Sequence, residues 1–348
     1  MTITNAKISY ICGILPSYKI NNYDNKLFDD RVKNRIIKSS GVENRYVLNR
    51  KNDESILSLF IKAGQHVIDA LSWDKNSIKG IIVVSQTHEY RFPVTAALLQ
   101  DKLGIHNNCF AYDIVMGCSG YTYGLFSAMS HINSTNNRIL LFVGDAMNDF
   151  VYPKNKSVAF LFSDGASCTA LEYSKNENYK NTFMFETFGN KSQLIIAKDG
   201  GNKNPINSSS FEEFIDDDGN MNIAACMQMK GIELFDFMCN IVPISILNFM
   251  KSNGFKIADT EKFFLHQANI FALKEIARKL DIVDNIEELM PINIHKYGNT
   301  SCASIPILMS EQGEINSRNV LLSGFGVGIS ICSLYIAKLE CSTELLFY

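Results

Sequence analysis

A cysteine in the first half of the chain has the surroundings expected of an activated nucleophile. Cys118 lies within DIVMGCSG, residues 113–120, directly after an apolar run and directly before residues 121–132, which can form a helix. At the start of a helix, unpaired backbone N–H groups and the positive end of the helix dipole favour a thiolate. Gly117 and Gly120 let the backbone and a substrate approach closely. We therefore predict that Cys118 is a nucleophile. The alternative is an inert buried thiol, which we expect for the other cysteines.

Three further short motifs contain residue types that could carry chemistry. His266 follows an apolar run and precedes a predicted helix, Asn299 lies in YGNTS at 297–301, and GFGVG at 324–328 places three glycines in five residues. Taken singly, a lone histidine is usually structural or exposed, and Gly-Asn-Thr is ordinary turn chemistry. The glycine-rich stretch predicts a loop whose backbone meets a ligand or an oxyanion. It lacks the G-x-G-x-x-G spacing of a dinucleotide site.

Short β-rich runs alternate with longer amphipathic segments, which is typical of an α/β protein with strands buried on both faces. A helix is predicted over residues 54–72 because Ile56, Phe60, Ala63, Val67 and Leu71 recur at helical spacing. A second helix is predicted from about residue 269, and a third opens near residue 234, where Pro243 should kink or end it. Buried strands are predicted at residues 80–85, 109–114, 138–144, 158–162, 262–265, 319–324 and 331–337.

Composition excludes several classes of protein. The chain has 348 residues, of which 46% are hydrophobic and 20% charged, and its formal net charge is −3. Charges of both signs are scattered, so no general footprint for nucleic acid or an anionic membrane is present. The nine cysteines include no C-x-x-C pair, and no spacing suggests a metal site. With no signal-peptide pattern and no apolar run of membrane-spanning length, we expect a cytoplasmic protein with reduced thiols, no metal, no nucleic-acid partner and no membrane association.

The segment 188–222 is rich in Asn, Ser, Asp and Gly and predicts a long surface excursion between two compact halves. We place the division near residue 175, which gives an N-terminal half, 1–175, with the cysteine and a C-terminal half, 176–348, with the histidine and asparagine. The acidic run within the excursion is expected to be a solvated loop. A docking surface for a basic partner is the alternative.

Together these motifs resemble the 3-oxoacyl-(acyl-carrier-protein) synthase III family of the thiolase superfamily. The resemblance covers nearly the whole chain. Its motifs occur in family order: SGV at 40–42, SQT at 85–87, FP at 92–93, GCSG at 117–120, FSDGA at 162–166, HQAN at 266–269, YGNTS at 297–301 and GFG at 324–326.

The resemblance implies an α/β protein with a five-layered α-β-α-β-α fold of two similar halves, a homodimer, and a Cys118–His266–Asn299 triad. It implies that Cys118 takes an acyl group from a thioester of coenzyme A or acyl carrier protein. His266 and Asn299 then stabilise the enolate left when a malonyl-type extender loses carbon dioxide. Backbone N–H groups of Cys118 and Val327 are expected to form the first oxyanion site, although Val327 replaces a usually small residue. No cofactor is implied.

The family resemblance also suggests substrate-binding positions at Phe92, Gly231 and Gly326, with Phe92 shaping the acyl pocket of the partner subunit. The chain departs from the family where the acyl carrier is received. The family tryptophan that stacks on adenine and a nearby arginine fall at Arg35 and Ser39. Two positions that are basic in the family are occupied in this chain by Phe271 and Asp236.

These departures favour a specialised lipid or secondary-metabolite pathway over a housekeeping one. Retention of both His266 and Asn299 favours carbon–carbon bond formation. The alternatives are a simple acyltransferase to a hydroxyl or amine, and a noncatalytic partner subunit of a ketosynthase. A papain-like hydrolase has the same chain order of Cys, His and Asn but a different sequence around the cysteine.

Overall fold

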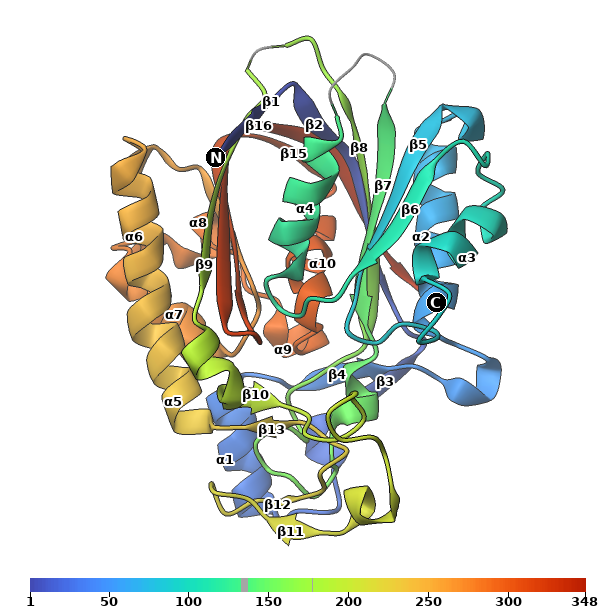
Figure 1. Cartoon of the computed structure of the whole chain (residues 1–348). Helices are drawn as coiled ribbons and strands as arrows, with labels where there is room; N and C mark the ends of the chain where they lie inside the picture. The colour runs from blue at the N-terminus through green and yellow to red at the C-terminus, as the bar shows by residue number, and fades with distance from the viewer. Residues whose placement is uncertain (133–136, 177) are drawn as a thin grey trace.

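The chain folds around one strongly curved mixed sheet that encloses two helices (Figure 1). The computed structural model describes residues 1–132, 137–176 and 178–348. Within those residues the sheet has ten strands. Eight follow one path across it: β1 (Thr2–Thr4), β9 (Lys180–Thr187), β16 (Ser330–Phe347), β2 (Ala6–Leu15), β8 (Gly165–Tyr173), β7 (Arg138–Asp145), β5 (Ile78–Val84) and β6 (Phe110–Ile114). The other two are β15 (Glu314–Gly326), which pairs with β16, and β14 (Lys262–Leu265), which pairs with β15.

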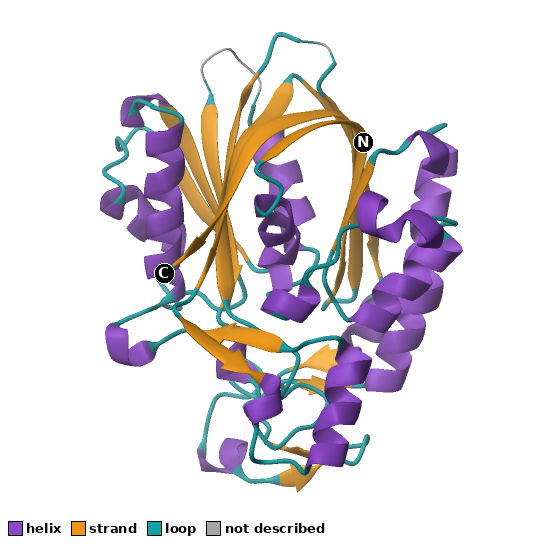
Figure 2. Cartoon of the chain, turned by 180° about the vertical axis from the view of Figure 1, so that it is seen from behind, coloured by secondary structure: helices purple, strands orange, loops and turns teal. Residues whose placement is uncertain are grey.

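Helices cover both outer faces of the curved sheet and fill its centre (Figures 1 and 2). The central helices are α4 (Gly120–Ser130) and α10 (Ser304–Ser310). The outer helices are α2 (Ile56–Ala70) and α3 (Thr95–Lys102) on one side, with α5 (Gly231–Asp236), α6 (Val242–Ser252) and α7 (Ile270–Lys279) on the other. This order gives the five α-β-α-β-α layers, so the predicted fold class is confirmed.

Smaller elements form the end of the molecule that lies lowest in Figure 1 and the links between layers. The remaining α-helices are α1 (Asp30–Ser40), α8 (Ile286–Leu289) and α9 (Ile294–Tyr297). Three two-stranded sheets pair β3 (Tyr18–Asn21) with β4 (Asn44–Val47), β10 (Ile195–Ile196) with β13 (Gln228–Met229), and β11 (Phe214–Ile215) with β12 (Met221–Asn222).

Strand pairing crosses the line between the two proposed halves. The end of β16, Ser342 to Phe347, runs parallel to Tyr10 to Leu15 of β2, and β1 pairs with β9. The last strand of the chain therefore closes the sheet of the first half. The division into 1–175 and 176–348 stays a prediction.

Most predicted elements form where the apolar pattern places them. The predicted strand over 158–162 is wrong, because this stretch forms successive turns. The carbonyl of Asn155 accepts the N–H groups of Val158 and Ala159, at 3.3 and 2.9 Å, and its side chain accepts the N–H of Ser157. Val158, Ala159 and Phe160 are nevertheless buried. An apolar run of strand length therefore marks burial here without marking a strand.

Pro243 does not end its helix. The chain stays helical from Gly231 to Ser252, and residues 237–241, which end two residues before the proline, form a π-helical turn. A widened turn accommodates the missing N–H and the bulk of the proline ring. Among the described residues this is the one helix long and apolar enough to cross a membrane, and half of its most apolar window is buried inside the protein. Its Leu234, Phe237 and Ile246 belong to the core beside α7, as in the core helix of a globular protein.

The start of α2 offers a test of local structure. The Ser55 hydroxyl accepts the N–H of Ser58 at 3.2 Å, and the Ser58 hydroxyl accepts the N–H of Ser55 at 2.9 Å. We expect Ser55→Ala to lower the free energy of unfolding by about 1 kcal/mol, because an orphan helix N–H loses its acceptor. Denaturant unfolding monitored by circular dichroism measures the loss. Ser72→Ala, just beyond the other end of α2, is the comparison, and an equal loss there would contradict the capping role.

Candidate active site

Cys118 lies in the tight loop between β6 and α4, two residues before the helix begins at Gly120. The side chain is buried. Two glycines of β15 allow the strand to pass against it: a Cβ on Gly326 would lie 2.8 Å from the Cys118 sulfur, and a Cβ on Gly324 would lie 2.8 Å from the Cα of Ser119. The glycine-rich motif therefore meets the predicted nucleophile, as the sequence suggests.

The backbone of Val327 faces the sulfur of Cys118. A hydrogen bond from this backbone favours the thiolate, but burial dominates and raises the pKa of Cys118 to about 11. Burial therefore opposes the thiolate that the start of the helix was expected to favour. The Val327 side chain fits here because residue 117 is a glycine: a Cβ on Gly117 would lie 2.2 Å from Val327 Cγ1.

His266 follows the last residue of β14 and lies inside the protein. Its backbone N–H donates to the carbonyl of Ser323 on β15, and its Nδ1 is hydrogen-bonded to Ser304 Oγ at 2.6 Å. The ring lies edge-on to Phe325, with centroids 5.5 Å apart. Burial lowers the pKa of His266 to about 3, so the imidazole is neutral at physiological pH.

Asn299 and Ser301 lie on one buried loop that reaches the other two residues of the triad. Asn299 Oδ1 accepts the N–H of Ser301 at 2.9 Å, and Asn299 Nδ2 donates to the carbonyl of Ala268 at 3.5 Å. Ser301 also lines the cavity beside Cys118, and its backbone interacts with His266. Ser301 is therefore a common neighbour of all three predicted catalytic residues. Its φ of 52° is uncommon for a residue with a side chain.

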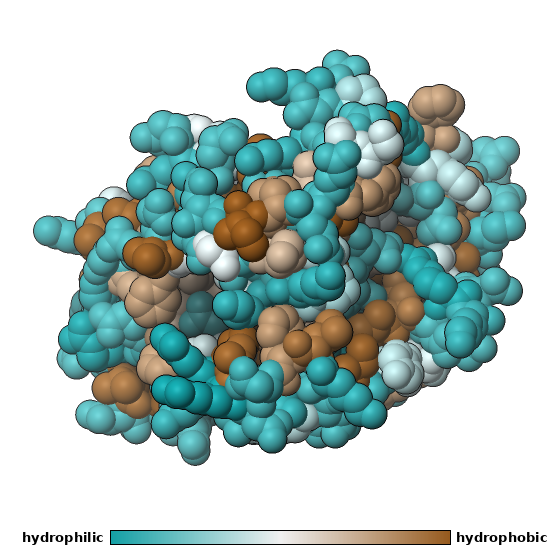
Figure 3. Space-filling view, turned by 90° about the horizontal axis from the view of Figure 1, so that it is seen from below, coloured by the Kyte–Doolittle hydropathy of each residue, from teal (hydrophilic) through white to brown (hydrophobic). Residues whose placement is uncertain are grey.

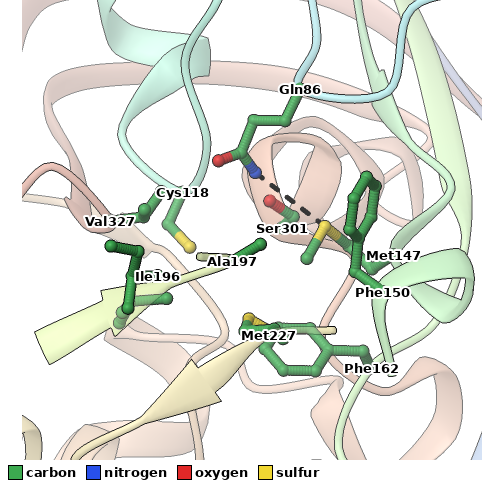
Figure 4. A pocket seen from close by; sticks show the side chains of 11 residues that line it. Gln86, Cys118, Met147, Phe150, Phe162, Ile196, Ala197, Met227, Ser301 and Val327 are labelled. Atoms are coloured by element: carbon green, nitrogen blue, oxygen red, sulfur yellow. Dashed lines mark hydrogen bonds between the residues drawn. The ribbon is translucent and has the colours of Figure 1, made fainter. Parts of the chain in front are cut away.

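A cavity of about 350 Å³ opens onto Cys118. Its wall is mostly apolar, and the side chains that line it come from distant segments (Figure 4). The lining residues are Gln86, Cys118, Met147, Phe150, Phe162, Ile195, Ile196, Ala197, Met227, Ser301 and Val327. Five of these eleven belong to motifs singled out in the sequence, and Val327 among them was predicted only for its backbone. The other six lie outside those motifs: Met147, Phe150, Ile195, Ile196, Ala197 and Met227. The apolar triplet at 195–197 within the polar excursion is the one local signal that could have found part of this wall.

A second cavity, of about 590 Å³, lies between α1, α5 and the start of α7. Gly231, Phe235, Asn269, Phe271 and Ser39 are among the residues that line it. The face seen from below is hollowed, and apolar side chains border the hollow between polar ones (Figure 3). Two positions where the chain departs from the family pattern, 39 and 271, therefore lie on the wall of this cavity.

The predicted substrate-binding residues lie in three different places. Gly326 touches Cys118, and Gly231 lines the second cavity. Phe92 is 85% exposed and lies outside the cavities of its own chain that are described above. Over the described ranges, the structure contains no cluster of three or more His, Cys, Asp or Glu side chains that could hold a metal ion.

Known proteins match this chain over almost its full length. Residues 112–191 match the model of 3-oxoacyl-[acyl-carrier-protein (ACP)] synthase III, and residues 250–338 match the model of its C-terminal part. A beta-ketoacyl-[acyl-carrier-protein] synthase III of Streptococcus agalactiae is 31% identical over 338 residues, which cover 95% of this chain and 98% of the relative. A putative 3-oxoacyl-[acyl-carrier-protein] synthase 3 of Campylobacter jejuni is 30% identical over 334 residues, which cover 93% of this chain and 92% of the relative.

Solved structures agree with the sequence matches. The crystal structure of a 3-oxoacyl-(acyl-carrier protein) synthase from Burkholderia xenovorans has a TM-score of 0.90 and 32% identity, over 100% of this chain and 98% of that one. Identity at this level over the full length, with the cysteine, histidine and asparagine motifs in order on a five-layered fold, places the chain in the 3-oxoacyl-(acyl-carrier-protein) synthase III family of the thiolase superfamily.

Proposed function

We propose that the chain loads an acyl group from a thioester onto Cys118 and condenses it with a malonyl-type thioester, releasing carbon dioxide and a 3-oxoacyl product. The observation that supports this most directly is the apolar cavity that opens onto the Cys118 sulfur beside the backbone of Val327. An apolar cavity suits an acyl chain, and a backbone N–H at its inner end suits the oxyanion of a tetrahedral intermediate.

In the first step the Cys118 sulfur attacks the carbonyl carbon of the acyl thioester. The negative charge that develops on the carbonyl oxygen is stabilised by the N–H groups of Cys118 and Val327, and the donor thiol leaves. The side chains of Phe162, Met227 and Ile196 hold the acyl chain in the cavity (Figure 4).

In the second step the malonyl thioester loses carbon dioxide and leaves an enolate. A neutral imidazole has one N–H, so His266 donates a hydrogen bond to the enolate oxygen, and Asn299 Nδ2 donates a second. The enolate carbon attacks the acyl-enzyme carbonyl and expels Cys118 as a thiolate, which takes up a proton from water to restore the thiol. A simple transfer to a hydroxyl or amine would not need two side-chain donors at this position, which is why we favour condensation. The noncatalytic subunit stays the other alternative.

The relatives are named for acyl carrier protein, and we propose a thioester of acyl carrier protein or coenzyme A as the donor. The changed positions on the second cavity, with Phe271 on its wall, support a specialised carrier or pathway. We also propose a cytoplasmic location, because every cysteine in the chain is unpaired.

Intact-protein mass spectrometry after incubation with a panel of acyl thioesters tests the proposed function. We expect a mass gain of one acyl group in the native chain and none in Cys118→Ala. Cys239→Ala removes another buried cysteine, far along the chain on the α5–α6 helix, and should still be acylated. A folded chain that takes no acyl group from any donor would favour the noncatalytic subunit. An acylated chain that never consumes malonyl thioester would favour the simple acyltransferase.

We propose that two copies of the chain form a dimer across the edge strand β6. Within the residues that the structure describes, this strand pairs only with β5, so one of its edges has unpaired backbone groups. Val115, which follows β6, is largely exposed, and so is Phe92 in the loop before α3. The Asp113 carboxylate on β6 accepts the N–H of Thr95 at the start of α3, which holds these two segments together.

Val115→Glu is therefore expected to convert the dimer to a monomer, because it would bury a charge in the interface. Light scattering after size exclusion measures the mass. Leu27→Glu, a similar change at another exposed aliphatic residue, should leave the mass unchanged. A native chain that elutes as a monomer would refute the proposed dimer.

A further inference from the structure

Two polar side chains interrupt the otherwise apolar wall of the cavity that opens onto Cys118. Among the described residues that line it, only Gln86 and Ser301 have side chains that carry oxygen or nitrogen. Figure 4 shows these two on one side of the cavity, with Phe162 and Met227 on the other. The steps proposed above use neither of the two side chains. In a mostly apolar pocket, a few placed polar groups determine which ligand is accepted.

Asp145 holds these two polar residues next to one another. Its carboxylate accepts the backbone N–H of Gln86 at 2.7 Å and the thiol of Cys302, which follows Ser301 in the chain, at 3.2 Å. Asp145 is fully buried at the end of β7, so both contacts lie within the core. Gln86 and Ser301 therefore present their side chains to the cavity as one unit, although they lie far apart in the sequence.

Neither side chain has all its hydrogen bonds satisfied within the protein. Ser301 is fully buried, and its Oγ has no hydrogen-bond partner among the described residues. The Gln86 amide makes two long contacts, both through Nε2, to Asp145 Oδ2 at 3.5 Å and to the Met147 sulfur at 3.8 Å. Over the described part of the chain its Oε1 accepts no hydrogen bond. Because an unpaired buried polar group costs free energy, the cavity favours an occupant that supplies both a donor and an acceptor.

The Gln86 amide lies beside the nucleophile. It packs against Gly117, the residue before Cys118: a Cβ on Gly117 would lie 2.8 Å from Gln86 Nε2 and 2.9 Å from its Cδ. Successive Cα atoms are about 3.8 Å apart, so the amide lies near the first carbons of an acyl group on the sulfur and not near its far end. A substituent on C2 would lie next to the carbonyl oxygen in the oxyanion site. C3 is therefore the nearest carbon that can present a group to Gln86 and Ser301.

We propose that the acyl group loaded onto Cys118 carries a hydroxyl group on C3. This inference rests on the proposed function and names the class of its donor, a 3-hydroxyacyl thioester. A hydroxyl is both a hydrogen-bond donor and an acceptor. It donates to Gln86 Oε1 and accepts the hydrogen of Ser301 Oγ. One ligand group thus satisfies both side chains, which a hydrocarbon chain of the same shape would leave unpaired.

The rates of acyl loading from two donors of equal shape test this preference. Each enantiomer of a 3-hydroxybutyryl thioester is compared with a 3-methylbutyryl thioester, in which a methyl group replaces the hydroxyl. Both are supplied as coenzyme A and as acyl-carrier-protein thioesters, and loading is followed by intact mass. We expect the native chain to load the better hydroxybutyryl enantiomer about 100-fold faster or more, because a site that hydrogen-bonds a hydroxyl rejects the analogue that lacks it.

Two variants show whether the preference comes from these side chains. Gln86→Met keeps the length of the side chain and removes its polar atoms, and Ser301→Ala removes the hydroxyl. In each, the ratio of the two loading rates should fall by about 10-fold or more. A variant that only loosened the site would slow both donors by the same factor. Met227→Leu, an apolar change in the same wall, is the control and should change both rates by a similar factor.

The proposal is overturned if the native chain loads the 3-methylbutyryl group as fast as the better hydroxybutyryl group. It is also overturned if the polar-site variants that fold keep the native ratio, or if Met227→Leu lowers the ratio as much as they do. Loading of plain acyl groups with no preference would refute this inference and still support the proposed function. Failure of every thioester to load the folded chain would refute the proposed function, and this inference with it.

Discussion

His266→Ala is expected to leave acyl loading of Cys118 almost intact and to slow condensation by about 100- to 1,000-fold, the usual loss when one oxyanion donor is removed. Loading depends on Cys118 and Val327, whereas the enolate develops its charge beside His266 and Asn299. The native imidazole is neutral, since burial lowers the pKa of His266 to about 3, so alanine removes a hydrogen-bond donor and no positive charge. The condensation rate should therefore fall by a similar factor at every pH from 6 to 8.

Separate measurements of the two half-reactions check this expectation. Acyl-enzyme is counted by intact mass, and condensation is followed by release of carbon dioxide from labelled malonyl thioester. His106→Ala, at an exposed histidine, should change neither. If His266→Ala also blocked loading, His266 would serve the first step, and the assignment of its role to the enolate would be wrong.

Gly326→Ala is expected to reduce acyl loading by at least about 100-fold while the chain still folds. The added methyl group would lie 2.7 Å from Cys118 Cβ and 2.8 Å from its sulfur, so the nucleophile must move. Displacement of a reacting group by about 1 Å can cost about 100-fold in rate. The φ of 150° at Gly326 also disfavours any residue with a side chain.

A second glycine separates crowding from backbone strain. Gly219 also has a positive φ, of 73°, but a Cβ there would meet no atom within 4 Å. Gly219→Ala should therefore lose some stability to strain and no acyl loading. Thermal unfolding and intact mass, measured on both variants, give the two quantities. Normal loading in Gly326→Ala would show that β15 can move away from Cys118 without harm.

The thiol of Cys118 illustrates where local sequence stops being informative. Its position before a predicted helix is visible in the sequence, and α4 does begin at Gly120. Its protonation state is not visible, because it depends on how much water the rest of the chain removes. Residues more than 180 positions away, such as Ser301 and Val327, help to bury the sulfur, and burial raises its pKa to about 11.

The same limit of local sequence applies to the structure of residues 158–162 and to the wall of the cavity. An apolar run predicts burial, and Val158 and Phe160 are buried. Whether the run forms a strand depends on available partners, and Asn155 instead holds it in turns. The polar segment 188–222 is predicted to be a long surface excursion, yet its Ile195–Ile196 strand pairs with β13 and lines the cavity that opens onto Cys118.

The sequence by itself determined the layered α/β fold, the family and the positions of Cys118, His266 and Asn299, because periodic burial and short motifs are local properties of the chain. Only the tertiary structure decided which distant side chains wall the cavity, how the end of β16 pairs with β2, and that Asp145 lies next to Cys302 behind the nucleophile. These features depend on contacts between segments separated by tens to hundreds of residues, and on the desolvation that those contacts cause, which no local pattern encodes.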